Sequence, residues 1–517
     1  MPAHPRLLAL LDRLQIAHEH SPRAQAEAQA LAAQPRIDDP ALIDRTALPL
    51  CTIDEPTSMD LDQALFVEAT PDGHRVWYAI ADAAWFVRPG TALWDEALSR
   101  GSSYYLPGLT LPMLPRVLSE DIVSLNAGVD RRALLFVLEL DATGRVRDRR
   151  LERARVRSRA KLSYQGVQAW YDGAGPAGCD RAVQQSLRAL VEVGKRRIAL
   201  AEDRGVVAFR RRPVDLSTDA GSGQIIAYED LRRPVERYNE QLSLMSNVAG
   251  ARFLRQRQDA VHAIYRVHPP PAPQRLAALR RRVDALVGGR GLDPDRWAWS
   301  GDPATLSDWL AGLPTGGEEG RLAEVLHRQA VVSSGRAGFT ATPGGHHGVG
   351  ADVYGRFTAP MREIVGVYLH GEAAEGLGGP DSGPTDPTQA HALRDAVIAA
   401  AERAANHQKA LDREANRVVL DQVFAADVAA GGPVRRGTLM GLSRRKLHVR
   451  LDDPPLDVKV YLHHLEAQSG GRMGIDDDGI HLRRGDTRVL TLGDRVALVC
   501  RGPDPQADRW RLELADG

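Results

Sequence analysis

Three aspartates lie within nine residues of one another, in the segment from Thr52 to Gln63. They are Asp54, Asp60 and Asp62, and a strand-like stretch leads into them. Hard divalent cations such as Mg2+ prefer carboxylate oxygens, and short aspartate side chains lose little conformational entropy around an ion. A cation held in this way can orient a scissile phosphate and an attacking water. The spacing does not fit a calcium-binding EF-hand loop, and it leaves two interpretations open, a magnesium site or an aspartate-rich surface turn.

Basic residues alternate along the chain between positions 145 and 161, where eight of the nine odd-numbered residues are arginine or lysine. In an extended strand, a period of two places all of them on one face. Arg155, Arg157 and Arg159 lie within this run. The pattern indicates either a surface that binds a phosphate backbone or a solvated strand face balanced by acidic neighbours.

Aromatic residues and one further arginine accompany these patterns. Tyr105, Tyr164 and Phe209 lie near basic segments of the chain. Each could stack on an unpaired base, which is worth about 1–3 kcal/mol, or pack in the core. Arg362 closely follows Pro360. A turn fixed by this proline would direct the arginine away from the chain, where it could bind a phosphate or stabilise charge during phosphoryl transfer.

The composition excludes several classes of protein. With 43% hydrophobic and 26% charged residues, the chain of 517 residues is neither disordered nor fibrous, and its length predicts roughly three domains. No apolar run approaches the ~18 residues of a membrane span, and the N-terminus lacks a secretory signal pattern. We therefore expect a cytoplasmic protein without a membrane partner. Cys51, Cys179 and Cys500 are too few for a disulfide framework or a zinc cage.

The formal net charge is zero, from 67 basic and 67 acidic residues. Taken alone, this balance argues against a strongly basic nucleic-acid-binding protein. A partner responds to local fields, however, and here acid gathers near residues 54–62 and base along residues 145–161. Only five of the 67 basic residues are lysines, and arginine suits bidentate recognition of phosphate.

We expect an α/β protein, of α+β character, with three structural units. Residues 1–48 predict a small helical module, with Ser21 capping its second helix. This module is expected to serve in docking or packing, or to bind nucleic acid in the manner of a helix-turn-helix. Residues 49–430 predict one large mixed body. Short alternating strands over 433–517 predict an OB-type β-barrel. Gly376–Thr388, rich in Gly, Pro, Asp and Ser, predicts an exposed loop.

Several elements can be located more closely. In the body, a strand is predicted over Val76–Ile80, and helices are predicted over Glu240–Arg257 and His391–Val423. In the barrel, strands are predicted over Lys446–Leu451 and Val458–Leu462. The aspartate segment precedes all of these elements, and Arg362 lies between the two helices.

Six sequence blocks occur in the same order as in a known family, and the separations between them are similar. They are Asp54–Gln63, Ile80–Asp82, Arg100–Pro107, Leu111–Pro115, Ser124–Asn126 and Phe357–Arg362. On these blocks the chain resembles the ribonuclease II (RNB) family over roughly residues 50–430, and its barrel resembles the family's ribosomal-protein-type RNA-binding OB domain. The resemblance implies a processive, hydrolytic 3′-to-5′ exoribonuclease. Such an enzyme threads single-stranded RNA into a deep channel and releases nucleoside 5′-monophosphates. It uses Mg2+, and Mn2+ can replace this ion.

By this resemblance, Asp54, Asp60 and Asp62 fall on the family's metal and catalytic positions, and Arg362 falls on its catalytic arginine. We assign catalysis to Asp60, Asp62 and Arg362. The family usually has a second aspartate where this chain has Gln63. The Gln63 carbonyl oxygen is a candidate metal ligand without charge, so the affinity for metal and the number of ions stay open.

The same resemblance implies contacts to RNA. Tyr105 and Phe209 fall on the two aromatics that sandwich the terminal bases. Tyr164 and Glu240 fall on positions near the terminal ribose, where the 2′-hydroxyl distinguishes RNA from DNA. We expect the RNA backbone to be guided by Arg155, Arg157 and Arg159.

Two further departures from the family bear on these expectations. After Arg362 the family continues with a basic residue, a tyrosine and later an aspartate, whereas this chain continues with Glu363–Gly366, which predicts looser support for the arginine. Only 53 residues precede Asp54, too few for the two cold-shock barrels of enterobacterial-type enzymes. We therefore expect a short form that lacks these barrels, in which the helical segment takes over RNA entry or leaves that role unfilled.

The main hypothesis is a monomeric, magnesium-dependent 3′-to-5′ exoribonuclease that acts on single-stranded RNA. Gln63 motivates an alternative, a catalytically weak or dead member of the family that only captures RNA 3′ ends. The aspartate cluster alone motivates a third hypothesis, a metal phosphodiesterase that acts on small nucleotides. The OB-type barrel argues against this third hypothesis, because a small substrate needs no second contact with RNA.

Overall fold

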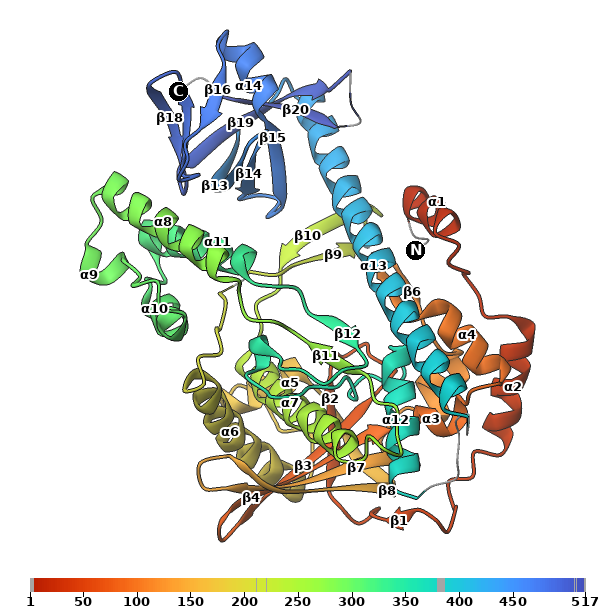
Figure 1. Ribbon diagram of the computed structural model, residues 1–517. Coiled ribbons are helices and arrows are strands. Elements are labelled where there is room, and N and C mark those ends of the chain that lie inside the picture. Colours follow the sequence, from red (N-terminus) through yellow and green to blue (C-terminus); the bar gives the residue numbers. More distant parts are fainter. Residues whose placement is uncertain are drawn as a thin grey trace.

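The fold mixes helices and strands, as the sequence predicts (Figure 1). A computed structural model describes residues 4–210, 212–219, 221–378, 386–505, 507 and 509–515. A strand-containing body lies at one end, a second strand-rich unit lies at the other, and the long helix α13 (Pro387–Ala429) runs from the first toward the second. Of the loop predicted at 376–388, residues 379–385 lie outside the described residues.

The body is built on six strands, β1 (Ile43–Asp44), β2 (Leu50–Asp54), β3 (Gln63–Thr70), β4 (Gly73–Ala81), β7 (Asp130–Asp141) and β8 (Val146–Ser163). Their order is β1-β8-β2-β3-β4-β7, and β7 also pairs with β8, so the sheet closes on itself. β2 is parallel to β8, whereas β3 is antiparallel to both β2 and β4. The aspartate segment is therefore the connection between two neighbouring strands, and its ends meet at one edge of the sheet.

Helices cover this sheet. α6 (Arg181–Glu202) packs on β3 and on α7 (Pro234–Arg255), and α7 packs on α12 (Ile364–Gly376). α7 starts with a proline in its first turn, and the Glu236 carboxylate accepts a hydrogen bond from the Arg233 N–H at 3.1 Å. The shorter helices are α3 (Ala83–Phe86), α4 (Ala92–Arg100) and α5 (Tyr164–Tyr171). Across the described part of the chain, none of the helices combines the length and the apolar character that crossing a bilayer requires.

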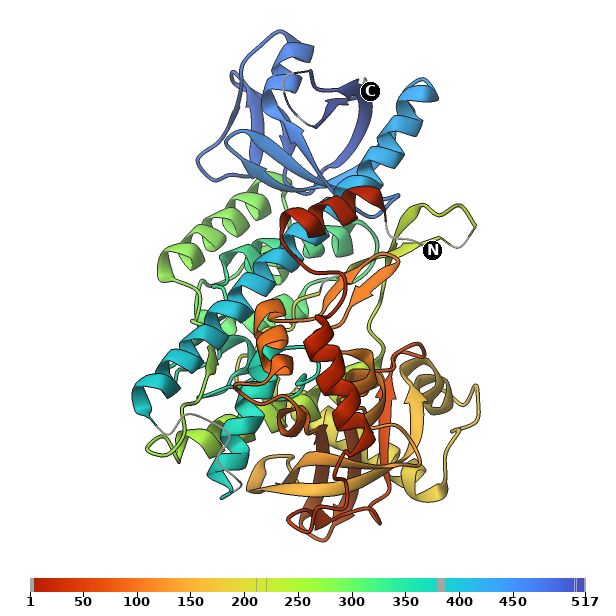
Figure 2. The same ribbon diagram turned by 90° about the vertical axis from the view of Figure 1, so that its right-hand side faces the viewer.

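The two N-terminal helices pack on the body (Figure 2). In α1 (Pro5–Arg13), Leu7 and Leu11 are fully buried, and Arg6 forms ion pairs with acidic residues of α13. In α2 (Pro22–Ala33), the Ser21 hydroxyl accepts a hydrogen bond from the Ala24 N–H at 3.3 Å, which is the cap that the Ser-Pro start predicts. Because α1 contacts α13 and α2 contacts α4, this segment packs on the body, the role that its sequence favours.

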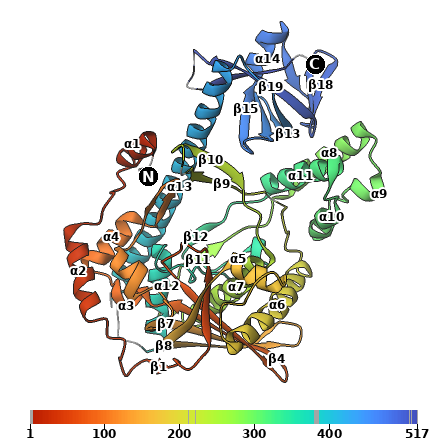
Figure 3. The ribbon, with the colours of Figure 1, turned by 180° about the vertical axis from the view of Figure 1, so that it is seen from behind.

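A helical layer and three antiparallel strand pairs lie between the sheet and the C-terminal unit. The helices are α8 (Pro273–Arg290), α9 (Pro294–Trp297), α10 (Leu306–Gly312) and α11 (Gly317–Ser333), and they share a hydrophobic cluster around Trp297 and Trp299. Two of the pairs are hairpins, β5 (Tyr104–Leu106) with β6 (Leu109–Leu111) and β9 (Val214–Thr218) with β10 (Ile225–Glu229); the third joins β11 (Tyr265–Val267) to β12 (Gly338–Thr340), which α8 to α11 separate in sequence. Figure 3 shows β9 and β10 between α13 and α11, beneath the C-terminal unit.

The C-terminal unit is rich in strands and OB-like, as predicted. Its five-stranded sheet has the order β15 (Asp457–Tyr461), β14 (Lys446–Leu451), β13 (Arg435–Ser443), β19 (Arg495–Pro503) and β20 (Trp510–Leu514). A second sheet contains β16 (Met473–Ile475), β17 (His481–Arg484) and β18 (Thr487–Thr491), and α14 (Leu462–Ser469) lies between β15 and β16 in sequence. The strands predicted at 446–451 and 458–462 correspond to β14 and β15.

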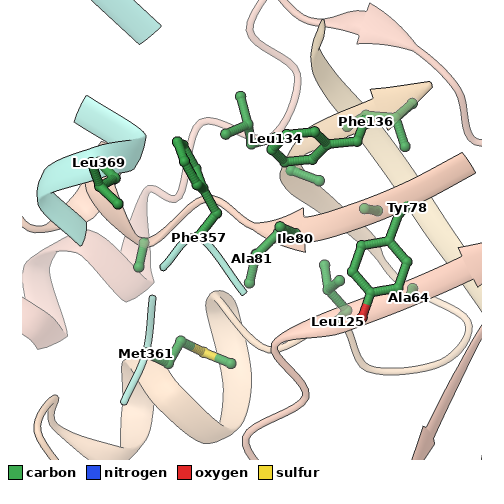
Figure 4. Packing of buried hydrophobic residues seen from close by; sticks show 14 of the residues in the cluster. Ala64, Tyr78, Ile80, Ala81, Leu125, Leu134, Phe136, Phe357, Met361 and Leu369 are labelled. Carbon is green, nitrogen blue, oxygen red and sulfur yellow. The ribbon is translucent and has the colours of Figure 1, made fainter. Parts of the chain in front are cut away.

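The loop of residues 356–362 is anchored in the core of the body. Phe357 and Met361 are buried, and the Phe357 ring meets Phe136 edge to face with 5.8 Å between the ring centroids (Figure 4). A Cβ at Gly250 of α7 would lie 2.5 Å from the Phe357 ring. Glycine at this position therefore lets the loop and the helix approach this closely.

Alanine substitutions at two helical glycines test this close approach. Alanine normally stabilises a helix relative to glycine by up to about 1 kcal/mol. At Gly288 of α8 an added Cβ meets open space, so Gly288→Ala should stabilise the protein slightly. Gly250→Ala should instead destabilise it by ~1–3 kcal/mol, because the methyl group displaces Phe357. Urea unfolding measures both changes, and stabilisation by Gly250→Ala would contradict the packing.

Candidate active site

A buried ion pair joins the aspartate segment to the 356–362 loop. Asp62 is 3% exposed, and its Oδ2 accepts a hydrogen bond from Arg362 Nε at 2.6 Å. Its Oδ1 accepts a hydrogen bond from the Met361 N–H at 3.0 Å. A buried carboxylate is stable only when its charge is compensated. Two segments that are 300 residues apart in sequence are therefore held together at this point.

Asp54 and Asp60 lie beside this pair, and both are half-buried. Burial, together with the charges of Asp62 and Asp60, raises the pKa of Asp54 to about 7 against the opposing charge of Arg362. Burial also raises the pKa of Asp60, and Arg362 again opposes the rise. The structure thus brings the three aspartates and the arginine predicted from the sequence into one electrostatic site.

The donor set of this site fits a hard divalent cation. Three carboxylates supply oxygen ligands, which is the ligand type that Mg2+ and Mn2+ take in proteins. Their raised pKa values reflect buried negative charge that a cation would neutralise. The residues that would hold the ion are Asp54, Asp60 and Asp62.

A tighter group of metal-type side chains lies in the barrel. His463, His464 and Asp504 place one donor atom each within 4.8 Å of one another, and they are the one such group among the described residues. Arg509 donates a hydrogen bond from Nε to Asp504 Oδ2 at 2.7 Å. The same Asp504 oxygen lies 3.1 Å from His464 Nε2, so its neighbours in the barrel account for this carboxylate, and we assign the group to an ion-pair cluster.

The Gln63 side chain is engaged by three protein groups. Its Oε1 accepts hydrogen bonds from the hydroxyl of Tyr78 and from the hydroxyl of Ser243, the latter at 3.2 Å. Its Nε2 donates to the carbonyl oxygen of Thr358. The oxygen that the sequence offers as a metal ligand is therefore already used by two donors.

Tyr105 and Tyr164 also lie at this site, on different elements. Tyr105 belongs to β5 and is 46% exposed; burial of its hydroxyl raises its pKa, and the charge of Arg362 opposes the rise. Tyr164 begins α5, and its hydroxyl accepts a hydrogen bond from Asn239 Nδ2 at 3.0 Å. Burial and the charge of Asp54 raise the pKa of Tyr164 to about 12, so both hydroxyls are neutral near pH 7.

Two other predicted RNA contacts lie in different surroundings. Phe209 packs against the hydrophobic cluster of α8–α11, in the helical layer above the sheet. Glu240 lies on α7 next to Asn239, and its carboxylate pairs with Arg232 at 3.3 Å. Glu240 thus follows Asn239, the partner of Tyr164, in the sequence of α7, whereas Phe209 belongs to the neighbouring layer.

A polar stripe on α7 was not predicted from the sequence. Asn239, Ser243 and Asn247 are four residues apart and so lie on one face of the helix. In this order they form hydrogen bonds with Tyr164, Gln63 and the hydroxyl of Thr358. Their spacing in a helix with many buried residues is the signal that could have found them.

A second ion pair closes the two ends of the 356–362 loop. Arg356 Nε lies 3.1 and 3.0 Å from the two carboxylate oxygens of Glu363, and its Nη2 lies 2.8 Å from one of them. Burial raises the pKa of Glu363, but the charge of Arg356 outweighs it and the net shift is downward. The expectation that the residues after Arg362 support this arginine only loosely is therefore wrong. Glu363, which departs from the family pattern, forms an ion pair with Arg356 and so closes the loop.

The arginines of β8 alternate outward as predicted, and each of the three candidates has an acidic partner. The pairs are Arg155–Asp44 at 2.6 Å, Arg157–Asp130 at 2.6 Å and Arg159–Asp180 at 3.2 Å. Between them, Val156 and Ser158 point inward. At Arg155, Arg157 and Arg159 the surface is thus a charge-balanced strand face, the second interpretation that the sequence pattern left open.

Comparison with known proteins identifies the family. The RNB domain matches residues 43–371 of the chain. The chain belongs to the RNB family. Ribonuclease R of Vibrio cholerae is 31% identical over 369 residues, which cover 69% of this chain and 42% of that protein. This RNB chain spans about half the length of the curated relatives that it matches first.

Solved structures share the RNB fold. Mycoplasma genitalium RNase R in complex with ribose methylated single-stranded RNA has a TM-score of 0.85 at 22% identity, over 99% of this chain and 78% of that one. Yeast Ssd1, described as a pseudonuclease, has a TM-score of 0.61 at 14% identity, over 91% of this chain and 54% of that one. Because a pseudonuclease also has this fold, the chemistry of the present RNB chain has to be argued from its own residues.

The raised pKa of Asp54 predicts a pH-dependent gain in stability for Asp54→Asn. In the unfolded chain this carboxyl ionises near 3.8, and in the folded, metal-free protein near 7. The folded wild type therefore loses stability as the pH rises from about 4 to 7. Asp54→Asn removes this loss. The free energy of unfolding of the variant, relative to the wild type, should therefore increase between about pH 4 and pH 7 and level off above pH 7, at on the order of 1–3 kcal/mol. Unfolding in EDTA at pH 5 and pH 8 measures it, and equal effects at both pH values would contradict the burial of charge.

Proposed function

We propose that this protein is a magnesium-dependent 3′-to-5′ exoribonuclease that degrades single-stranded RNA to nucleoside 5′-monophosphates. The observation that carries the proposal is the buried Asp62–Arg362 pair with Asp54 and Asp60 beside it, in a chain of the RNB family. Acidic side chains that attract a cation and an arginine that faces the same space suit a reaction at a phosphodiester.

Each side chain has a distinct part in this proposal. Asp54, Asp60 and Asp62 would hold magnesium, which when bound polarises the scissile phosphate and favours an attacking water. Asp62 fixes the Nε edge of Arg362, and the arginine side chain remains 38% exposed. The rest of the guanidinium can therefore stabilise negative charge that develops on the phosphoryl oxygens.

The two tyrosines provide contacts for the RNA 3′ end. Tyr105 is exposed enough for a base to stack on its ring. The Tyr164 hydroxyl is neutral, fixed by Asn239 and close to Asp54, which suits recognition of a ribose hydroxyl. Glu240, next to Asn239 on α7, could accept a further hydrogen bond from the ribose if it left Arg232.

We propose that RNA approaches through a cleft rather than along β8. A cleft of about 1290 Å3 is lined by α11, the β9–β10 hairpin and the barrel. Its arginines are Arg210 and five others that each form an ion pair with a carboxylate, Arg212, Arg321, Arg328, Arg450 and Arg495. The Arg210 guanidinium donates to the carbonyl oxygens of Ala311, Leu313 and Pro314, which carry no formal charge to cancel its own. Such an arginine presents more positive potential to a phosphate than one paired with aspartate.

The activity itself is tested with a 5′-labelled single-stranded RNA. With Mg2+ we expect stepwise shortening from the 3′ end, loss of this activity in EDTA, and resistance of a DNA of the same sequence. Asp62→Asn should lower the rate by roughly 10²–10³-fold or more, because it removes both a metal ligand and the partner of Arg362. Asp477→Asn, at an exposed barrel position, is the matched control and should leave the rate unchanged.

Other outcomes of this assay identify the alternatives. Internal cleavage, or activity that survives Asp62→Asn, would contradict the proposal. RNA binding without product at any Mg2+ or Mn2+ concentration would identify a catalytically dead 3′-end-binding protein. Saturation by dinucleotides, without preference for longer RNA, would identify a phosphodiesterase for small nucleotides.

The proposed approach path predicts how salt affects RNA binding. Each phosphate contact to a single strand contributes ~0.7 to the slope of log K against log salt concentration. Arg210→Gln in the cleft should therefore lower the slope by ~0.7, because this arginine donates to backbone carbonyls. The triple change of Arg155, Arg157 and Arg159 to Gln should leave it nearly unchanged, since these arginines are paired. Fluorescence anisotropy in an Asp62→Asn background measures both slopes, and the reverse order would place the RNA on β8.

A further inference from the structure

We propose that Gln63 is a positioning residue that holds the Arg362 loop through its carboxamide, and that it does not ligate the metal. The inference rests on the proposed function, because it assigns a role within the same site. It is motivated by the hydrogen bonds that occupy both ends of the side chain.

The contacts of Gln63 require a group that both accepts and donates hydrogen bonds. Oε1 has two lone pairs, and it accepts from the hydroxyls of Tyr78 and Ser243. Nε2 donates to the Thr358 carbonyl. A carboxylate could accept the first two hydrogen bonds, but it would face the Thr358 carbonyl without a proton to donate. A glutamine thus makes a contact with the loop that an aspartate or glutamate cannot make.

The groups around Gln63 form a neutral network. Tyr78 is fully buried in β4, and its hydroxyl also lies 2.6 Å from the hydroxyl of Ser243. Burial raises the pKa of Tyr78, so the hydroxyl keeps its proton. None of these three side chains carries a charge, and hence none of them needs a cation to remain in place.

Consecutive residues of β3 and its entry hold the same loop at two points. Asp62 binds Met361 and Arg362 near the end of the loop, and Gln63 binds Thr358 near its start. The two contacts span the turn that aims the Arg362 guanidinium. If Gln63 releases Thr358, the turn gains freedom while the acidic ligands stay where they are.

The α7 stripe strengthens the hold on the start of the loop. Asn247 Oδ1 accepts a hydrogen bond from the Phe357 N–H at 2.7 Å, and Asn247 Nδ2 donates to the Thr358 hydroxyl at 3.0 Å. Ser243, one turn earlier, donates to Gln63. Gln63 therefore completes a connection from β4 and α7 to Thr358.

The test separates metal binding from positioning with Gln63→Leu and Tyr78→Phe. Tyr78→Phe keeps the ring and removes only the hydroxyl that reaches Gln63. Mn2+ binding to the RNA-free protein is measured by calorimetry, and kcat and KM for single-stranded RNA are measured at saturating Mg2+. We expect kcat to fall at least ~10-fold in both variants, with the Kd for Mn2+ within ~3-fold of wild type. Gln63→Leu/Tyr78→Phe should lose no more kcat than the worse single variant, because both act through one network.

Tyr171→Phe is the matched control, since it removes a hydroxyl that donates to the Leu187 carbonyl at 2.7 Å, outside the site. It should leave kcat unchanged. A Gln63→Leu protein with more than ~10-fold weaker Mn2+ binding, or a Tyr78→Phe protein with normal kcat, would overturn the inference. These results require a wild type that hydrolyses RNA, so they are distinct from failure of the proposed function, in which the wild type itself yields no product. If Gln63→Leu does not fold, the kcat and the Kd for Mn2+ of Tyr78→Phe alone test the inference.

Discussion

The compensation of one buried carboxylate is the constraint on which the rest of the site depends. Asp62 is almost fully buried, and leaving such a charge unpaired would cost roughly 3–5 kcal/mol. Its partners, Met361 and Arg362, belong to a loop far away in sequence. The loop must therefore reach the edge where β2 and β3 meet, and its anchors serve this requirement. Phe357 enters the core, and Gly250 leaves the space for it.

Charged and neutral groups have separate tasks around this pair. The neutral groups Gln63 and Asn247 fix the start of the loop without drawing charge into the core. The aspartates beside the pair are held half-buried at an energetic cost, which appears in the raised pKa of Asp54. A fold built only for stability would have replaced such a carboxylate. Its retention is expected where a cation, and not another side chain, is to neutralise it.

Local elements could be predicted from the sequence because their signals are local. The strand at 76–80, the helix within α13 and the alternation along β8 follow from hydrophobic period and turn residues. The partners of long side chains could not be predicted in this way. The oxygen of Gln63 looked available because Tyr78 and Ser243 are distant in sequence, and Arg159 looked unpaired because Asp180 lies on another element. Such contacts follow from the closed sheet and its helices, which no short pattern specifies.

Ion pairing also decides how the arginines of a chain with zero net charge act on a polyanionic partner. An arginine paired with a carboxylate contributes little field at a distance, however exposed it is. The candidate arginines of β8 are paired in this way, since each lies beside an aspartate. Arg210 is not, since its hydrogen bonds go to backbone carbonyls. What an arginine is paired with, and not how many arginines follow one another in sequence, therefore decides where a phosphate backbone is attracted. By this criterion Arg210 presents more positive potential to a phosphate than the three paired arginines of β8.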